Sequence, residues 1–585
     1  MRDGGYISDH EDYGYNTGEF CEFDWACNMR AYVADFETTT DVDDCRIWAW
    51  CVCSVDNPDM LEFGNDIETF VKWCRAAANC QMYFHNLAFD GAFIMDWLER
   101  NGWSWIEDRK DAKERTYTTI ISDSNQVYML TLYFEAGVKV VIYDSLKIIP
   151  LSVAQMAKAY GLDEGKGSLD YTAYREVGHE LTEDEKEYIR LDVQIVAKVV
   201  KIFLEGKLTK MTAGSNALYD YKQMLGGYRK FRRIYPLIDK DVDDFIRRAY
   251  RGGFTYCKPD LAGVELGEGI VLDVNSLYPS VMAATDGQLL PIGDPVWFDG
   301  EYKYDKYFPL WVAVVNCRFK IKPNHIPCIQ LKGNFRYGQT EYIEDSKGEV
   351  TFMVSSVDWE LITQQYDVKD VHWHGGFMFQ ANDVQFRKYV DKWTDVKIQA
   401  TLDGNKGKRQ IAKLMLNSLY GKFATRLEVK SRRPILIDDV LRYIDLPPVE
   451  RESVYLPVGV FITAYARYKT ITSAQKVYDR FIYADTDSLH LLGTDIPDCL
   501  EIDDVRLGAW KHESTFQRAK FLRAKTYMEE CDGELTIHVA GMPAKLHSQV
   551  TFDNFNLGAK YYGKLYTKRV TGGIVLVEGE MEIRE

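Results

Sequence analysis

Residues 481–490 read FIYADTDSLH, two short apolar runs that meet at a turn carrying Asp485 and Asp487. This pattern predicts a hairpin of two strands with both acids at its tip. Two carboxylates beside apolar neighbours repel each other strongly unless a cation neutralises them. The stretch therefore favours a cation site, and an ordinary aspartate-rich hairpin turn is the alternative.

A second acidic strand is the expected partner of this hairpin. Residues 270–279 read IVLDVNSLYP, an apolar strand that ends in Asp273 and runs into a tight turn. Exposed backbone N–H groups in such a turn, as at Ser276 and Leu277, can bind phosphate oxygens. The two segments together predict acids from separate strands beside a phosphate-binding turn.

A basic helix supplies the complementary charge. Over residues 409–421, Arg409, Lys413, Asn417 and Tyr420 recur at helical spacing and form one stripe. Two cations, an amide and a flat ring suit a nucleoside triphosphate. An ordinary surface helix is the alternative. With the two acidic strands, this helix indicates nucleotidyl transfer.

Near the N-terminus, Asp35 and Glu37 lie two apart in an apolar strand and would share one of its faces. Alone this signal is weak, because about three Asp-x-Glu triplets are expected by chance. Asp90 lies in YFHNLAFDG, where Asn86 would share its face if the segment were helical. An acidic cluster here would suit divalent cations.

A long amphipathic helix carries the fourth acid of this group. Thr182 and Glu185 form a capping box that opens a helix to about residue 204. Asp192 follows Tyr188 by one turn of this helix. Four carboxylates could hold two Mg²⁺ ions for phosphodiester hydrolysis, and Tyr188 could orient the attacking water.

Composition limits the class of protein. The 585 residues carry 71 Lys and Arg against 88 Asp and Glu, a net charge of −17, which argues against an evenly basic nucleic-acid coat. Locally, residues 385–434 reach +9 (13 basic, 4 acidic) and residues 511–526 reach +4 (5 basic, 1 acidic), whereas residues 1–29 carry −6 (1 basic, 7 acidic). DNA is therefore expected at two basic patches.

The chain shows no targeting or export signal. Its apolar runs are too short to span a bilayer. Its 12 cysteines include no Cys-x-x-Cys pair, and the closest two, Cys51 and Cys53, are expected on opposite faces of a strand. A reducing cytoplasm is the predicted location.

Taken in order, these segments resemble a known family. DVNSLYP (273–279), KLMLNSLYG (413–421), YADTDS (483–488) and KTY (525–527) resemble the successive motifs of family B DNA polymerases. They are most similar to the protein-primed branch of small tailed phages, the phi-twenty-nine type. DFETTT (35–40), YFHNLAFDGAF (83–93) and YIRLD (188–192) resemble the proofreading exonuclease motifs of the same enzymes. The resemblance covers about residues 30–585.

The resemblance implies a multidomain α/β and α+β fold. An RNase H-like 3′→5′ exonuclease domain would cover residues 30–212, after an acidic extension at 1–29. A right-hand polymerase would occupy 213–585, with its palm at about 213–284 and 456–527. Fingers would lie at about 385–424 and the thumb at about 528–585. Two insertions typical of protein-primed enzymes would lie at about 285–375 and 425–455.

The resemblance also implies roles at the polymerase site. Asp273, Asp485, Asp487 and the Val274 carbonyl would hold two Mg²⁺ ions, for which Mn²⁺ can substitute. The incoming nucleotide would meet the turn at Ser276 and Leu277 and the side chains of Tyr278, Lys397, Arg409, Lys413, Asn417 and Tyr420. Tyr278 would exclude a 2′-hydroxyl, and Lys413 is also assigned as catalytic. DNA would contact Tyr250, Gly252, Gly253, Thr463, Arg467, Lys525 and Tyr527.

At the exonuclease site, the resemblance implies two further Mg²⁺ ions on Asp35, Glu37, Asp90 and Asp192, with Tyr188 and Lys166 as catalytic residues. The single-stranded end would contact Thr38, His85, Asn86, Phe89 and Ser145. The chain departs from the family at Ser168, where an aspartate is usual, in its acidic extension, and in a short segment after Tyr527.

The implied function is replication of a linear genome by protein-primed, strand-displacing synthesis with proofreading. Its partners would be primer/template DNA, dNTPs and a terminal protein, bound as a monomer or in a 1:1 complex in the cytoplasm of an infected bacterium. A primer-independent or repair polymerase of the same family is one alternative. An inactive DNA-binding homologue is another, although all seven expected catalytic carboxylates are present.

Overall fold

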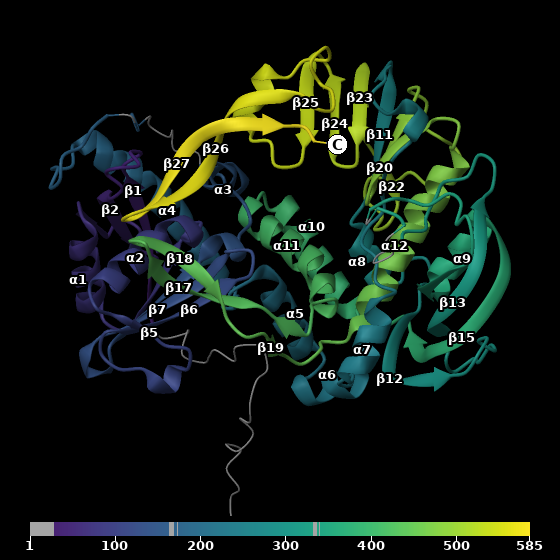
Figure 1. Cartoon of the computed structure of the whole chain (residues 1–585), viewed down its shortest axis with the longest axis horizontal. Helices are drawn as coiled ribbons and strands as arrows, with labels where there is room; N and C mark the ends of the chain where they lie inside the picture. The colour runs from purple at the N-terminus through teal and green to yellow at the C-terminus, as the bar shows by residue number, and fades with distance from the viewer. Residues whose placement is uncertain (1–28, 163–168, 172, 332–335, 339, 585) are drawn as a thin grey trace, which may run out of the picture.

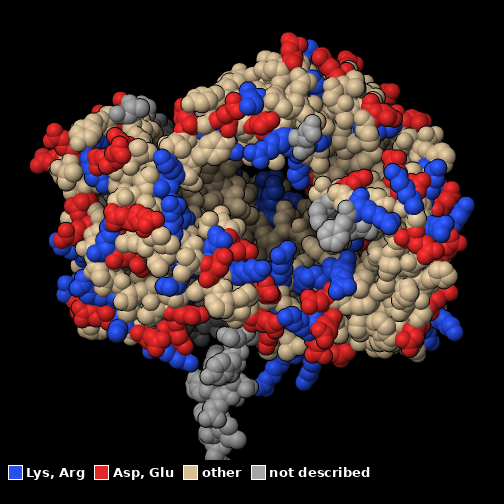
Figure 2. All heavy atoms as spheres, in the orientation of Figure 1, with Lys and Arg blue, Asp and Glu red and all other residues tan. Residues whose placement is uncertain are grey.

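The computed structural model describes residues 29–162, 169–171, 173–331, 336–338 and 340–584. An N-terminal α/β unit lies on one side of the molecule, and a helical and β-rich part curves around from the other (Figure 1). In the same orientation the surface is deeply hollowed between them, and Lys and Arg side chains gather around the hollow (Figure 2). The fold thus surrounds a central space that bears positive charge.

The N-terminal unit is built on a mixed sheet of ten strands. In its centre β1 pairs in parallel with β4, and β4 pairs in parallel with β8. All five residues of β4 are buried, as expected for a central strand covered on both faces. The strands are β1 (Arg30–Thr38), β2 (Ile47–Ser54), β3 (Leu61–Gly64), β4 (Cys80–Phe84), β5 (Ser104–Trp105), β6 (Thr116–Ser122), β7 (Val127–Tyr133) and β8 (Lys139–Asp144), joined by β17 and β18 described below.

Four helices accompany this sheet: α1 (Ile67–Ala77), α2 (Leu87–Arg100), α3 (Val153–Tyr160) and α4 (Glu183–Glu205). The capping box predicted for α4 is confirmed, because Thr182 and Glu185 each accept from the other's backbone N–H. The apolar face of α4 packs in one core with Ala31 and Val33 of β1. Tyr188 and Asp192 are thereby fixed one turn apart, next to β1.

The expectation that Cys51 and Cys53 face opposite sides of a strand is wrong. Residues two apart on a strand share a face, and both cysteines lie in one core while Trp50 and Val52 lie in the other. Their thiols are free.

A five-stranded antiparallel sheet, in the order β22-β11-β21-β20-β9, carries the second half of the chain. Its strands are β9 (Thr255–Cys257), β11 (Gly269–Val274), β20 (Phe481–Asp485), β21 (Ser488–Leu492) and β22 (Trp510–Phe516). The helices of this half are α5 (Ala213–Met224), α6 (Tyr228–Ile234), α7 (Lys240–Arg247), α8 (Leu277–Met282), α9 (Ser356–Gln365), α10 (Arg387–Leu402), α11 (Lys406–Phe423) and α12 (Leu456–Lys476). Of these, α12 is the long apolar helix that packs in one core with β11 and β20.

The first predicted insertion forms a sheet of its own. Its four strands are β12 (Leu290–Phe298), β13 (Leu310–Ile321), β14 (Val350–Ser355) and β15 (Tyr366–Asn382), in the order β12-β15-β13-β14. The sheet continues beyond residue 375, where the insertion was expected to end. The antiparallel pair α10 and α11 follows it and projects toward the central space (Figure 1).

The second predicted insertion joins the N-terminal sheet. Strands β17 (Ser431–Ile437) and β18 (Val440–Asp445) form a hairpin, and β17 pairs with β6 through Ser431 and Arg432. The pair β16 (Glu428–Val429) and β19 (Val449–Glu450) closes its base. An element 300 residues away in sequence thus becomes the edge of the N-terminal sheet.

The C-terminal strands form a further four-stranded sheet and a long hairpin. A sheet in the order β10-β23-β24-β25 comprises β10 (Glu265–Leu266), β23 (Arg518–Arg523), β24 (Thr526–Cys531) and β25 (Glu534–Val539). From it the long hairpin β26 (Lys560–Val570) and β27 (Gly573–Glu582) arches to the N-terminal unit (Figure 1). At its tip a Cβ on Gly572 would meet the Cys45 carbonyl oxygen at 2.2 Å, so only glycine fits.

The positive charge of Arg569, near this tip, lies over the Tyr443 ring of the β17–β18 hairpin, 3.7 Å from its centroid. The two hairpins therefore meet.

Among the described helices, none is both long and apolar enough to cross a membrane.

The ion pairs of Glu185 lead to a pH prediction. Burial raises the pKa of the Glu185 carboxyl, but hydrogen bonds from Arg175, His179 and the Thr182 backbone outweigh it and lower that pKa to about 2. A carboxyl with a lowered folded-state pKa stabilises the fold above its unfolded pKa, and loses this effect as pH falls toward the folded value. Glu185→Gln should therefore cost roughly 2 kcal/mol at neutral pH.

Urea unfolding of both proteins at several pH values measures this. The stability difference should stay constant down to about pH 4.5 and shrink below it. If the stability difference between the two proteins instead grew as pH fell below about 4.5, the lowered pKa of Glu185 would be wrong.

Candidate active sites

The predicted hairpin is confirmed, and it brings three aspartates together. Asp485 ends β20, Asp487 follows it in the turn to β21, and Asp273 pairs across the sheet with Ser488. The backbone N–H of Val274 donates to the Asp487 carbonyl at 2.8 Å. The strand ends are therefore locked together, with the acids at one edge.

The electrostatics of these acids differ. Burial and the neighbouring charge of Asp487 raise the pKa of Asp273 to about 7, and burial also raises the pKa of Asp487. Asp485 is instead ion-paired, since Lys525 Nζ lies 2.6 and 2.9 Å from its two oxygens. Two repelling carboxylates at a strand edge have the donor chemistry that a hard divalent cation requires.

Lys511 is a cation at this site that sequence reasoning missed. Its Nζ lies 3.8 Å from Asp273 Oδ1 and also pairs with Glu513. Lys511 faces Asp273 because the two residues are partners across β22 and β11. The only signal in the sequence was its place in the second basic patch.

No group of three or more His, Cys, Asp or Glu side chains with metal-binding geometry occurs among the described residues.

The basic stripe of α11 lies as predicted. Arg409, Lys413 and Asn417 are exposed, while Ile411 and Leu419 are buried on the opposite face. Burial and the charges of Arg409, Lys413 and Lys511 lower the pKa of Lys397 on α10. Four cations thus converge, an arrangement that an anion stabilises.

Two tyrosines join the basic helix to the acidic strands. The rings of Tyr278 and Tyr420 stack with centroids 4.0 Å apart. Ser276 adopts left-handed dihedrals (φ 54°) immediately before α8, and the side chain of Leu277 is buried. The phosphate-binding turn predicted here is therefore a bend between β11 and α8, beside the tyrosine stack.

Residues 250–253 lie against the β20–β21 hairpin that carries Asp485 and Asp487. A Cβ on Gly253 would come within 2.8 Å of Thr486 and 3.0 Å of the Tyr278 hydroxyl, so glycine is required by close packing. Gly252 is exposed, and Tyr250 is half-buried. This segment links the acids to the central space.

Three residues that were predicted to contact DNA, Thr463, Arg467 and Tyr527, are buried in this structure. Thr463 is 1% exposed, and its hydroxyl donates to the Gly459 and Val460 carbonyls. Tyr527 is 9% exposed and packs in an aromatic core. Both side chains therefore pack into the protein in this structure.

Arg467 is the third of these buried residues. It is 5% exposed and forms a bidentate pair with Asp358 at 2.7 and 2.8 Å. It also donates to the carbonyls of Arg251 and Gly252 at 2.7 and 2.8 Å. Its guanidinium therefore fixes the backbone of the 250–253 segment.

A second acidic group forms in the N-terminal unit. Asp35 and Glu37 lie on β1, and Asp90 is buried on α2. Burial and the charges of Asp35 and Glu37 raise the pKa of Asp90 well above its usual range. Burial, together with the charges of Asp192 and Glu37, likewise raises the pKa of Tyr188. Residues from three elements thus converge, with oxygen donors that suit divalent cations.

Tyr171 belongs to this group, although the sequence reasoning missed it. Its hydroxyl lies 2.6 Å from that of Tyr188. Tyr171 lies outside helices and strands, so no periodicity could place it. Lys166 and Ser168 lie outside the described residues.

The residues expected to grip a single-stranded end surround the same acids. Both ring nitrogens of His85 are engaged, by Ser145 Oγ at 2.9 Å and the Leu151 carbonyl at 2.7 Å. Asn86 precedes α2 in a left-handed conformation (φ 83°), so it does not share a helical face with Asp90 as expected. Thr38 ends β1, and Phe89 lies in the first turn of α2.

Buried Asp144, which the sequence reasoning also missed, holds the backbone around Asn86 and Leu146 in place. Its Oδ1 accepts from the backbone N–H groups of Asn86 and Leu146, both at 3.0 Å. Because Asp144 caps two turns at once, it fixes Asn86 and Ser145 relative to each other.

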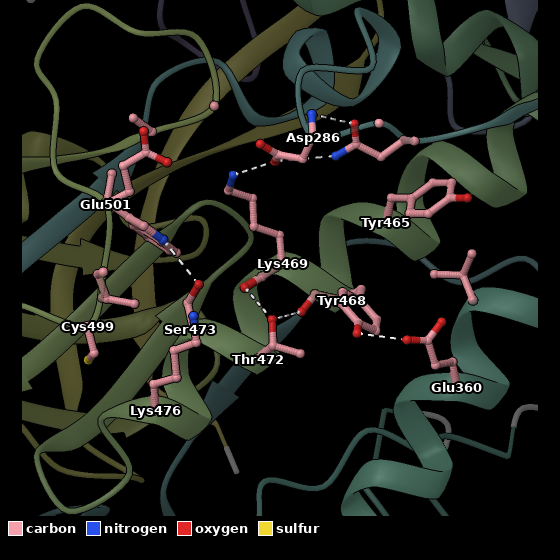
Figure 3. A pocket seen from close by; sticks show the side chains of 17 residues that line it. Asp286, Glu360, Tyr465, Tyr468, Lys469, Thr472, Ser473, Lys476, Cys499 and Glu501 are labelled. Carbon is pink, nitrogen blue, oxygen red and sulfur yellow. Dashed lines mark hydrogen bonds and ion pairs between the residues drawn. The ribbon is translucent and has the colours of Figure 1, made fainter. Parts of the chain in front are cut away.

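A separate cavity of about 410 Å³ contains none of the predicted site residues (Figure 3). It lies between α12, α9 and the loop before β22. Lys469 and Asp286 form an ion pair at 2.9 Å on its wall. Its charges are mixed, so it shows no preference for an anion or a cation.

Comparisons with known proteins agree with this arrangement. The family described as DNA polymerase type B, organellar and viral, matches residues 72–178 and 173–503. DNA polymerases of Bacillus phages PZA and phi29 are 42% identical over 95% of this chain, covering 100% and 99% of their own lengths. The DNA polymerase of Streptococcus phage Cp-1 is 32% identical over 95% of this chain and 98% of its own.

Among solved structures, phi29 DNA polymerase complexed with primer-template DNA superposes with a TM-score of 0.89 at 40% identity. The match covers 95% of this chain and 100% of that one. A second structure of that enzyme, with primer-template DNA and incoming nucleotides, gives the same values.

Proposed function

The chain belongs to the type B DNA polymerases of organelles and viruses, and within them to the phi29 type, and we propose that it replicates a linear DNA genome from a protein primer. It is a DNA polymerase with a multidomain α/β fold. The proposal adds strand displacement and 3′→5′ proofreading. The observation that carries it is the convergence of the acids Asp273 and Asp487 with the cations of α10 and α11.

At the polymerase site, Asp273, Asp485, Asp487 and the Val274 carbonyl would hold two Mg²⁺ ions, which supply Lewis-acid activation of the attacking 3′-hydroxyl and of the α-phosphate. The protein residues do the remaining work. Lys397, Arg409 and Lys413 neutralise the triphosphate as the primer oxygen displaces pyrophosphate. The Tyr278 ring blocks a 2′-hydroxyl, and Tyr420 packs against the new base pair.

Further contacts assign the rest of the nucleotide and primer. Asn417 and the turn at Ser276 and Leu277 approach the nucleotide, and exposed Lys525 steadies the primer end. The 250–253 segment guides the primer between the two sites. Its packing against Thr486 and Tyr278 supports that role.

At the N-terminal acids, Asp35, Glu37, Asp90 and Asp192 would hold two Mg²⁺ ions that activate water for hydrolysis. Tyr188, hydrogen-bonded to Tyr171, orients that water. Lys166 assists from the segment outside the described residues. The excised strand contacts Thr38, Asn86 and Phe89, whereas His85 and Ser145 bond to each other and shape the wall.

The subdomain roles follow from the same premise. The sheet of β12–β15 docks a terminal protein as a 1:1 complex, and the β17–β18 hairpin encloses the template. The basic residues Arg426, Lys430, Arg432 and Arg433 support a DNA-facing role for that region, although Lys430 pairs with Glu428 and Arg432 with Asp445. Because the relatives are phage enzymes, we place the reaction in the cytoplasm of an infected bacterium.

Transfer of the first nucleotide tests protein priming. The assay mixes the polymerase with labelled dNTPs, Mg²⁺ and the protein encoded by the neighbouring gene. We expect the label to become attached to that protein and to stay attached after the protein is denatured. Efficient synthesis on template and dNTPs alone, with no primer or second protein, would contradict protein priming. That outcome would favour the primer-independent alternative.

A further inference from the structure

A buried hydrogen bond between His490 and Glu529 involves the second strand of the β20–β21 hairpin. His490 of β21 follows Asp487 by three residues and is 2% exposed, and Glu529 of β24 is 4% exposed. His490 Nδ1 and Glu529 Oε1 are 2.7 Å apart. Because β21 and β24 belong to different sheets, the pair joins the sheet of the catalytic acids to the C-terminal sheet.

Three aromatic rings enclose the imidazole of His490. The centroids of Tyr483, Phe521 and Tyr527 lie 5.2, 5.3 and 5.1 Å from it. Its other nitrogen, Nε2, lies 3.4 Å from Ser488 Oγ. An imidazole covered on its faces and engaged at both nitrogens has one orientation, and removing its carboxylate leaves a buried polar group unpaired.

The same cluster reaches the lysine expected at the primer end. The backbone N–H of Lys525 donates to the Tyr483 hydroxyl at 2.8 Å, and its Nζ binds both oxygens of Asp485. Lys525 adopts a left-handed conformation (φ 57°), which costs a non-glycine residue free energy unless its surroundings fix it.

Alternation along β24 connects these residues. Tyr527 and Glu529 lie two apart on β24 and face the same side of the strand, and Lys525 lies in the turn directly before that strand. One end of this row meets Asp485, and the other meets His490. The contact between His490 and Glu529 therefore fixes β24, and with it the positions of Tyr527 and Lys525.

We propose that His490 and Glu529 are positioning residues for polymerisation. They hold β24 and the Tyr483 ring so that Lys525 reaches Asp485 and the primer end. Neither side chain touches a reacting group, and both act through Lys525. The inference rests on the proposed role of Lys525 at the primer end.

Glu529→Ala tests this inference directly. Incorporation from a primer/template in a single turnover should fall on the order of tenfold, and the Kd for that DNA should rise. Glu529→Gln keeps a hydrogen-bond acceptor for His490 and should recover most of the rate. Excision of single-stranded DNA, which depends on the distant N-terminal acids, should not change in either variant.

Glu530→Ala is the matched control. Glu530 is the next residue, faces the other side of β24, and pairs with Arg518 at 2.9 Å. Its loss removes a carboxylate from the same strand and should leave incorporation unchanged. Equal effects of the two alanine variants, or parallel loss of incorporation and excision, would overturn the positioning role.

A double-mutant cycle with Lys525→Ala separates the two levels of the argument. If Glu529 acts through Lys525, Glu529→Ala should have little further effect once Lys525 is replaced. An undiminished effect overturns the inference. Normal primer binding by Lys525→Ala alone overturns the proposed function of Lys525 instead. If Glu529→Ala does not fold, the milder His490→Gln, alone and combined with Lys525→Ala, completes the same cycle.

Discussion

Asp487→Asn should reduce template-directed incorporation at least about a thousandfold, because the substitution removes several kcal/mol of charge stabilisation from the transition state. Asp487 and Asp273 face one another at the edge of the central sheet, and burial raises the pKa of both. Asp485 cannot move into the position of Asp487, since hydrogen bonds from Lys525 and Thr255 fix its carboxylate where it is. Single-turnover extension of a labelled primer measures the loss.

Asp495→Asn provides the control for Asp487→Asn. Asp495 is an exposed residue beyond the far end of β21, so it has the same chemistry but no place in the acidic edge. Its replacement should leave incorporation unchanged, and excision should continue in both variants. Incorporation by Asp487→Asn within tenfold of the unmodified enzyme would refute the assignment.

The double variant Asp35→Ala with Glu37→Ala should lower excision of single-stranded DNA at least about a thousandfold while sparing synthesis. Both residues lie on β1, where their charges help to raise the pKa of Asp90. Removing them relieves the repulsion that raises the pKa of the buried Asp90 carboxyl. Release of a labelled terminal nucleotide measures excision.

The matched control replaces two exposed acids just beyond β1. Asp41→Ala with Asp43→Ala removes the same charge from the same segment. Both activities should persist there. If the β1 variant lost synthesis and excision together, the separation of the two sites would be wrong.

The regular elements of both sites were predictable because their signals are local. The two acids of the hairpin, the stripe of α11 and the capping box of Thr182 depend on strand alternation, helical period and a four-residue cap. Each of these patterns repeats within a few residues. The structure accordingly places Asp485, Lys413 and Asp192 on the elements expected.

The missed residues depend on tertiary contacts. Asp144 caps two turns from separate segments, and Lys511 meets Asp273 only through strand pairing. Arg467 and Tyr527 lie in motifs whose resemblance suggested DNA contact, but motifs do not reveal burial. Asn86 adopts a left-handed conformation that precedes a helix, and helical spacing cannot detect such a bend.

The pairing of β17 with β6 has a consequence for dividing the protein. A fragment that ends near residue 212 would keep the N-terminal acids but lose the strand that covers β6. Its sheet would then expose an unpaired edge, which favours association with other chains. The same fragment would uncover the side of α4 that contacts α11. The N-terminal unit is therefore not an independent domain, and a stable fragment of it would have to combine segments that are discontinuous in sequence.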